Sequence, residues 1–136
     1  MPDRNERRHA APDSRVLAAG LVSGLIAVVL AAIAAHGPMA PTDPTAQRQV
    51  DTAILMHFVH TLGLMLVAFW PAPTRWRAVI TAGWLLGILL FSGSLYALIL
   101  FGQSWPGPIT PLGGLFLMLG WLVWLIGLIV TRAPAR

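Results

Sequence analysis

Four stretches without a charged side chain decide the fold: VLAAGLVSGLIAVVLAAIAA (residues 16–35), AILMHFVHTLGLMLVAFW (53–70), AVITAGWLLGILLFSGSLYALILFG (78–102) and LGGLFLMLGWLVWLIGLIV (112–130). Each stretch is 18 to 25 residues long. A helix rises about 1.5 Å per residue and needs about 20 residues to cross a hydrocarbon core about 30 Å thick. The sequence therefore predicts an all-α protein whose four helices cross a membrane and pack as one bundle.

The composition leaves no room for a water-soluble domain. Hydrophobic residues make up 57% of the 136 residues and charged residues only 10%, which is far from the composition of a soluble domain of this size. We expect a cytoplasmic tail at residues 1–15, a membrane domain at 16–130 and a second short tail at 131–136. The chain has no cysteine, which excludes disulfides, thiolate metal sites and cysteine nucleophiles.

The basic residues are all arginines, and they lie almost entirely on one side of the predicted membrane. Short loops rich in Lys and Arg stay in the cytoplasm, so the pattern predicts that both termini and the middle loop are cytoplasmic. We expect a multi-pass protein of the bacterial inner (plasma) membrane, with anionic lipid headgroups as partners of the arginines and no nucleic-acid partner. Eight arginines lie on this side, and Arg48 lies on the other: Arg4, Arg7, Arg8, Arg15, Arg75, Arg77, Arg132 and Arg136.

The first stretch could instead be read as a secretory signal, because basic residues precede it and Ala32–Ala35 supplies small residues near its end. Its 20 apolar residues exceed the usual signal core of roughly 7 to 15 residues. Removal of this stretch would also leave an odd number of spans. We therefore expect it to remain as the first membrane span.

Small residues recur at helical spacing within the stretches and predict faces where helices approach closely. In lipid, helix association depends on close packing and on hydrogen bonds between helices. Glycines repeated every seven residues indicate a continuous packing seam in the fourth helix. Such faces also allow a homo-oligomer or an accessory subunit of a membrane complex. The predicted faces are Gly20, Gly24, Ala27 and Ala31; Gly83 and Gly87; and Gly113, Gly120 and Gly127.

Capping residues set the expected helix starts. We expect Asp51 or Thr52 to cap the second helix, and Thr110 to cap the fourth, with Pro111 as its first helical residue. The segment before the second helix contains three prolines, which disfavour a continuing helix: Pro38, Pro41 and Pro44.

The polar side chains within the spans gather toward the outer face once the helices are oriented by arginine. Polar groups are costly in lipid and normally face the bundle interior or a cavity, so this cluster is the default candidate site. It contains His36, His57, His60, Ser92, Ser94, Tyr96 and Thr110.

Several of these residues carry a family resemblance. The strings FSGSLY (91–96), ITPLGG (109–114) and HTL (60–62), with Ala35-His36 and Gly120-Trp121, resemble the YgdD-like family of small bacterial inner-membrane proteins, which is related to a small animal transmembrane protein. The resemblance implies a four-helix membrane protein without an established reaction. It does not include His57, because the family often has a tyrosine–glutamine pair where Met56 and His57 stand. The family-motif polar cluster is His36, His60, Ser92, Gly93, Ser94, Tyr96, Thr110, Pro111, Gly113 and Gly114.

Two interpretations of the histidines remain open. His57 and His60 share a helix face, and His36 at a neighbouring helix end could complete a three-nitrogen metal or haem site. The spans contain no carboxylate that would support such a site. The favoured interpretation is structural: we expect His60 to form hydrogen bonds across helices to Ser92, Ser94 or Tyr96.

No catalytic motif accompanies the polar cluster. A hydrolase that paired serine with histidine would need an acidic third member, and the Gly-x-Ser-x-Gly turn is absent. We therefore expect a non-enzymatic structural or accessory protein of the membrane or envelope, without a cofactor. The alternative is a small transporter or channel whose outer vestibule is lined by His36, His60, Ser92 and Tyr96.

Overall fold

The computed structural model describes residues 11–38, 40–102 and 107–132 as four long helices and one short 3-10 turn. Each long helix is long and apolar enough to cross a membrane, which confirms the all-helical, four-span prediction. The tail residues 1–10 and 133–136 lie outside the described part, with Arg4, Arg7, Arg8 and Arg136 among them. The elements are α2 (Ser14–His36), α3 (Pro44–Phe69), α4 (Thr74–Leu100), η1 (Gly107–Ile109) and α5 (Thr110–Arg132).

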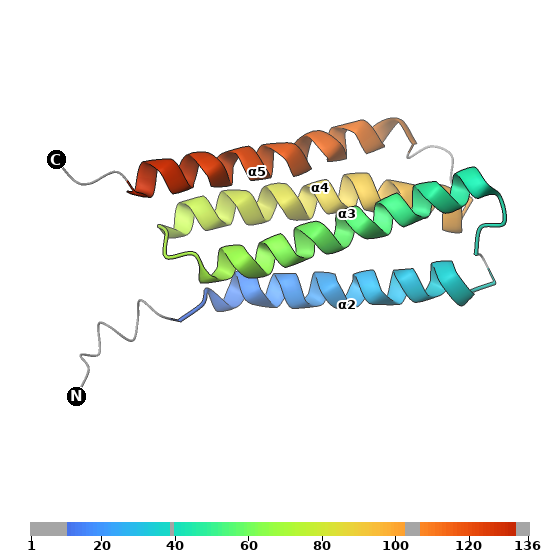
Figure 1. The fold of residues 1–136 in the computed structure, drawn as a ribbon, viewed down its shortest axis with the longest axis horizontal. Coiled ribbons are helices and arrows are strands. Elements are labelled where there is room, and N and C mark those ends of the chain that lie inside the picture. Colours follow the sequence, from blue (N-terminus) through green and yellow to red (C-terminus); the bar gives the residue numbers. More distant parts are fainter. Residues whose placement is uncertain (1–10, 39, 103–106, 133–136) are drawn as a thin grey trace.

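The four helices run antiparallel in chain order, with α3 and α4 between α2 and α5 (Figure 1). The start of α2, the turn between α3 and α4, and the end of α5 lie together at one end of the bundle, which we call the Asp13 end. The opposite end, where α2 ends and α3 begins, is the His36 end. The central helices have neighbours on two sides. In the most apolar 18-residue segment of each central helix 44% of the residues are buried, against 22% in α2 and α5.

Aspartates cap the first two helices. Asp13 Oδ1 accepts the backbone N–H groups of Arg15 and Val16 at 3.2 and 3.4 Å. Asp43 Oδ2 accepts those of Thr45 and Ala46 at 2.9 and 2.8 Å.

The start of α3 corrects the sequence prediction. The predicted cap at Asp51 or Thr52 is wrong, because α3 already begins at Pro44. Proline fits the first helical turn, where its missing N–H would have no partner in any case. The last of the three prolines, Pro44, is therefore the first residue of α3. The polar first turns of α3 extend the helix beyond its apolar stretch. The end of α4 is marked by a glycine: Gly102, two residues after the last helical residue, adopts a positive φ of 66°. This left-handed conformation commonly terminates a helix.

The core divides into two parts along the bundle. Near the Asp13 end and the middle, Trp84, Leu64 and Ile80 are completely buried between helices. Near the His36 end, Val50 and Ala53 of α3 pack with Leu95 and Tyr96 of α4. Large apolar side chains cover the outside of the bundle, as expected for a surface that faces hydrocarbon: Leu25, Leu66, Leu89, Met118 and Ile129 are each more than 60% exposed.

The glycine seam of α5 packs directly on α4 and on the tryptophans beside it. A Cβ on Gly113 would collide with the backbone at Phe91, and a Cβ on Gly120 would collide with the indole of Trp84. Gly127 is closed by the rings of Trp70 and Trp76. These contacts confirm the predicted packing seam.

The other small-residue faces are only partly confirmed. Gly20 and Gly24 of α2 face Met65 and Thr61 of α3, and Gly87 of α4 faces Leu117 of α5. Gly83 differs, because nothing lies within 4 Å of the position that its Cβ would occupy. A spacing of four residues predicted one common face, but of these two glycines only Gly87 is in close contact with α5.

Candidate functional site

A buried polar network joins α2, α3 and α4 in the middle of the bundle. Ser23 Oγ lies 2.7 Å from Thr61 Oγ1 and 3.1 Å from His57 Nε2. The other ring nitrogen, His57 Nδ1, lies 3.4 Å from the hydroxyl of Tyr96. All four side chains are at least 94% buried. His57 therefore connects all three helices through its two nitrogens.

A second network is built around His60 on a neighbouring face of α3. His60 Nδ1 lies 2.7 Å from the carbonyl oxygen of Met56, one turn earlier in the same helix. The indole N–H of Trp121 in α5 donates to His60 Nε2 at 3.0 Å. The acceptor geometry at Nε2 requires that Nδ1 carry the proton and donate to Met56. Trp84 places its ring edge-on to His60 and donates its own N–H to the carbonyl of Leu117 at 3.1 Å.

The two serines of α4 bond to different helices. Ser92 Oγ donates to the carbonyl oxygen of Ala53 in α3 at 2.8 Å. Ser94 Oγ lies 2.7 Å from Thr110 Oγ1 at the start of α5 and donates to the carbonyl of Phe91 at 2.8 Å. Ser94 therefore bonds to the preceding turn of its own helix, whereas Ser92 bonds to the backbone of α3.

The predicted partner of His60 is wrong. We expected Ser92, Ser94 or Tyr96, whereas His60 bonds to Met56 and Trp121. The cause is rotational: His57 and His60 are three residues apart, so they differ by about 60° around the helix. This angle directs His57 toward Tyr96 and His60 toward the tryptophans.

The alternative three-nitrogen metal site of His36, His57 and His60 is not assembled. Within residues 11–38, 40–102 and 107–132, no three His, Asp or Glu side chains converge in a group that could hold a metal ion. The ring nitrogens of His57 and His60 are already occupied by hydrogen bonds. His36 is exposed and is the last residue of α2.

The remaining motif residues lie in separate environments. Gly113 packs against the α4 backbone, Gly114 makes only ordinary contacts with Phe91, and Pro111 is exposed. Gly93 lies on the surface of α4 that faces α2. The four residues expected to line an outer vestibule, His36, His60, Ser92 and Tyr96, are therefore not brought together at one opening.

The sequence analysis gave no hydrogen-bonding role to four members of these networks, although Thr61 and Trp121 stand in the motifs HTL (60–62) and Gly120-Trp121: Ser23, Thr61, Trp84 and Trp121. Serine and threonine in helices often bond to a carbonyl of their own preceding turn. The sequence around Ser23 and Thr61 therefore did not indicate that the two side chains pair with each other. Trp84 did leave a local signal. Tryptophan is most frequent at membrane interfaces, and a tryptophan near the middle of a span needs an acceptor for its N–H.

A groove of about 630 Å³ lies between α2 and α4, and His57 of α3 borders it. Its lining is mostly apolar, with small residues such as Ala19 and Gly93 and larger ones such as Ile26 and Leu30. Ser23, His57 and Tyr96 also border it. Val22 and Leu89 at its rim are 58% and 67% exposed. The groove is therefore open toward the surrounding lipid.

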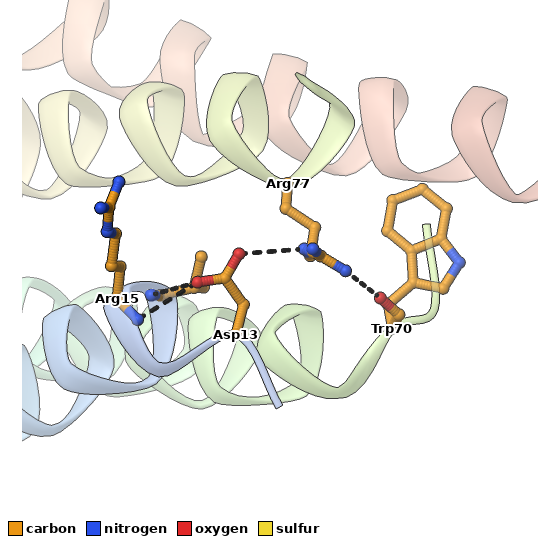
Figure 2. A network of polar contacts seen from close by, with 5 residues as sticks. Asp13, Arg15, Trp70 and Arg77 are labelled. Carbon is orange, nitrogen blue, oxygen red and sulfur yellow. Dashed lines mark hydrogen bonds and ion pairs between the residues drawn. The ribbon is translucent and has the colours of Figure 1, made fainter. Parts of the chain in front are cut away.

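A third polar cluster closes the Asp13 end. Arg77 of α4 forms an ion pair with Asp13, with 3.2 Å between Nε and Oδ2, and donates from Nη1 to the carbonyl of Trp70 at 3.0 Å (Figure 2). The backbone N–H of Asp13 also donates to the carbonyl of Ala68 at 2.8 Å. Residues 1–15 were expected to form a tail, whereas α2 begins at Ser14 and Asp13 joins its start to the end of α3 and the start of α4.

The sequence matches a known protein family over more than half of its length. The model of a family of proteins of unknown function, DUF423, matches residues 30–114. The chain belongs to the DUF423 family. The match includes the end of α2, all of α3 and α4 and the start of α5, and thus His57, His60, Ser92, Ser94 and Gly113.

Three relatives of this chain are named as membrane proteins. The UPF0382 membrane protein YwdK of Bacillus subtilis (strain 168) is 43% identical over 108 residues, covering 76% of this chain and 87% of the relative. A UPF0382 membrane protein of Haemophilus influenzae is 36% identical over 102 residues, covering 74% and 82%. One from Schizosaccharomyces pombe, C1782.12c, is 32% identical over 113 residues, covering 77% and 93%. No solved structure matches this chain.

These relatives confirm a multi-pass membrane protein from a family of unknown function. The more specific resemblance to a YgdD-like family and to an animal protein stays a prediction.

Proposed function

We propose that this DUF423 protein is a non-enzymatic structural or accessory component of the bacterial inner membrane that supports membrane or envelope integrity. The observation that carries the proposal is the use of the histidines. Both ring nitrogens of His57 and both of His60 are engaged in hydrogen bonds within the bundle. General acid–base or ligand chemistry would need one of these nitrogens to face a reactant.

The hydrogen bonds form a sequence of links from helix to helix. His57 ties α3 to α2 and α4, His60 ties α3 to α5, and Ser94 with Thr110 ties α4 to α5. Single hydrogen bonds of this kind contribute about 0.6 kcal/mol on average in a bilayer. Their distribution over all four helices supports a role in fixing one arrangement of the bundle.

Gene deletion tests the proposal when it is combined with two folded variants. We expect the deletion strain to leak small dyes or lose tolerance to membrane stress, and we expect wild-type protein to restore it. His60→Gln and Ser92→Ala should restore it equally whenever they accumulate to wild-type amounts, because a scaffold depends on the folded bundle. A deletion without effect on permeability, lipid composition or stress tolerance would contradict the proposal. So would a folded His60→Gln protein that accumulates normally and still fails.

The proposed orientation places the Asp13 end in the cytoplasm, and the arginine distribution supports it. Arg15, Arg75 and Arg77 lie at the Asp13 end, while Arg48 lies near the start of α3 at the His36 end. Positively charged short loops are retained in the cytoplasm. Anionic headgroups are the proposed partners of these arginines. Further contacts, either with a second copy or with a larger membrane complex, are proposed for the apolar outer surface.

The absence of cysteine permits a direct test of orientation. Thr42 lies at the His36 end and Thr74 at the Asp13 end, and both are exposed. We expect Thr42→Cys to react with a membrane-impermeant maleimide in cells whose outer membrane alone is permeabilised. We expect Thr74→Cys to react only after the inner membrane is also permeabilised. The reverse pattern would overturn the orientation, and the unmodified chain is the background control.

A further inference from the structure

A second groove runs along the neighbouring helices α4 and α5 (Figure 1). It is built from two hollows of about 210 Å³ and about 440 Å³, which share Val79 and Val123 and therefore continue into each other. Gly83 borders the groove, and nothing lies within 4 Å of the position that its Cβ would occupy. Val79 and Leu119 beside it are exposed, so the groove is open to the surrounding lipid.

The groove has about the length of one membrane leaflet. Arg75 borders one end of it and lies three residues before the apolar stretch of α4, which begins at residue 78. Leu86, the innermost residue of α4 in the lining, lies eight residues inside that stretch, or about 12 Å along the helix. Half of a hydrocarbon core about 30 Å thick is about 15 Å. The groove therefore extends from the headgroup level toward the middle of the membrane, as an acyl chain does.

The end of the groove at the membrane surface carries an arginine that the bundle does not use. Arg75 is exposed, and it makes no hydrogen bond or ion pair with the other residues that the structure describes. Arg77, two residues later, is instead engaged by Asp13 and by the Trp70 carbonyl. Trp76 borders the same end of the groove, and tryptophan is enriched at the headgroup level of membranes. Arg75 is therefore the arginine of this pair that is available to a headgroup.

Shape and charge together select the ligand. Apart from Arg75 and the indole of Trp76, the lining consists of glycine, alanine, valine, leucine and phenylalanine, which suits an acyl chain. An arginine beside a span lays its carbon stem on apolar surface and keeps its guanidinium at the interface. There the guanidinium attracts a negative headgroup. A headgroup that also carries an ammonium would bring a like charge close to Arg75, so a net negative phospholipid fits better than a zwitterionic one.

We propose that the α4–α5 groove binds one phospholipid with a net negative headgroup, whose phosphate contacts Arg75 and whose acyl chain lies along Gly83. This gives one defined site to the partnership between arginines and headgroups proposed above. It rests on the proposed orientation only for the assignment to the cytoplasmic leaflet. Binding to the purified protein does not depend on orientation, so failure of this site would leave the orientation and the scaffold role standing.

Native mass spectrometry of the full chain in mild detergent tests the site. The probes are phosphatidylglycerol and phosphatidylethanolamine with identical acyl chains, and the headgroup control is glycerol phosphate, which has no acyl chain. We expect one phosphatidylglycerol per chain to bind about fivefold more tightly than phosphatidylethanolamine, the preference expected from one arginine near the surface. We expect glycerol phosphate not to displace it. Equal binding of the two lipids, or displacement by equimolar glycerol phosphate, would overturn the proposal.

One pair of variants tests the headgroup contact. Arg75→Gln should remove the preference for phosphatidylglycerol and leave the binding of phosphatidylethanolamine unchanged. Arg15→Gln is its matched control, because Arg15 is exposed at the same end of the bundle but belongs to α2 and does not border the groove. A preference that persists in Arg75→Gln would overturn the proposal. So would an equal loss in Arg15→Gln, because it would show that net charge alone attracts the lipid.

A second pair of variants tests the groove. Gly83→Leu should fill it and abolish the saturable binding of both lipids. Gly93→Leu, on the surface of α4 that faces α2, is the matched control, since a Cβ there has only ordinary contacts at 3.7 and 3.8 Å. If Gly83→Leu does not fold, Ala82→Leu, at an exposed position on the same groove, replaces it.

The remaining outcomes of the groove variants are also decisive. Unchanged lipid binding in the groove-filling variant would overturn the proposal, because the acyl chain would then lie elsewhere. Equal losses in the groove-filling variant and in Gly93→Leu would overturn it as well. Loss of a dimer in the groove-filling variant, without a lipid preference in the unmodified chain, would assign the groove to a second copy instead.

Discussion

At the level of single residues, the indole N–H groups of Trp121 and Trp124 differ in what they meet. Trp121 donates to His60, whereas the buried Nε1 of Trp124 has no hydrogen-bond partner among the described residues. The two rings belong to the same aromatic cluster around Trp84, with their centroids 5.6 Å apart, although Trp121 is 41% exposed and Trp124 is more buried.

The first prediction follows from this difference. Trp121→Phe should destabilise the bundle by about 0.5 to 2 kcal/mol, because it leaves a buried histidine nitrogen without its donor. Trp124→Phe should cost less, since it removes an N–H that has no partner. Reversible unfolding in mixed micelles measures both. Equal effects of the two substitutions would show that ring volume matters and the hydrogen bond does not.

Residue types and spacing could indicate that polar groups meet inside this bundle, but not which groups meet. The sequence placed Ser94 and Thr110 at one depth, and they do bond. The partner of His60 was expected in α4 but lies in α5, because a polar residue on α3 can face α2, α4 or α5. The rotation of each helix decides among these neighbours, and large side chains such as Trp84, whose effect is not local, set that rotation.

At the level of helices, the contact of α4 with α5 depends on glycines whose missing Cβ atoms make room for the backbone. Gly113 and Gly114 are adjacent, yet only Gly113 faces α4 directly. A Cβ on Gly113 would meet the backbone at Phe91, which cannot rotate away, while a Cβ on Gly114 would lie 3.6 Å from the Phe91 ring.

The second prediction compares these neighbours. Gly113→Ala should destabilise the bundle by about 1 to 3 kcal/mol, the usual cost of overpacking a tight interface. Gly114→Ala should be neutral or slightly stabilising, because alanine is the better helix former. Thermal unfolding in detergent with a helix-sensitive signal provides the comparison. The seam interpretation fails if Gly114→Ala is as damaging as Gly113→Ala.

Helix existence was predictable here, and helix boundaries were less so. The apolar stretches had to be helical, since a spanning segment must satisfy its backbone hydrogen bonds internally. The same argument sets no limit on how far a helix continues into water. Asp43 and Pro44 start α3 several residues before its apolar stretch, and the proline that we read as a helix breaker is a helix starter.

For the whole molecule, the Asp13 end is held by an ion pair that joins three elements. Asp13 caps α2, bonds to the end of α3 through its backbone and pairs with Arg77, which in turn donates to the Trp70 carbonyl in the turn after α3 (Figure 2). The side chains of Asp13 and Arg77 are each 17% exposed. Water and salt therefore screen this pair less than a surface pair.

The third prediction concerns this closure of the bundle. Asp13→Asn keeps an oxygen for the α2 cap and removes the charge, and Arg77→Gln removes the other partner. A double-mutant cycle should give a coupling free energy of about 1 kcal/mol. Arg75→Gln is the control, because it removes an arginine from the same side of the membrane at an exposed position, so any effect of charge on topology is matched. A coupling within error of zero, or an equal loss of stability in Arg75→Gln, would mean that α2 is held by its apolar contacts with α3 and that the ion pair is incidental to the fold.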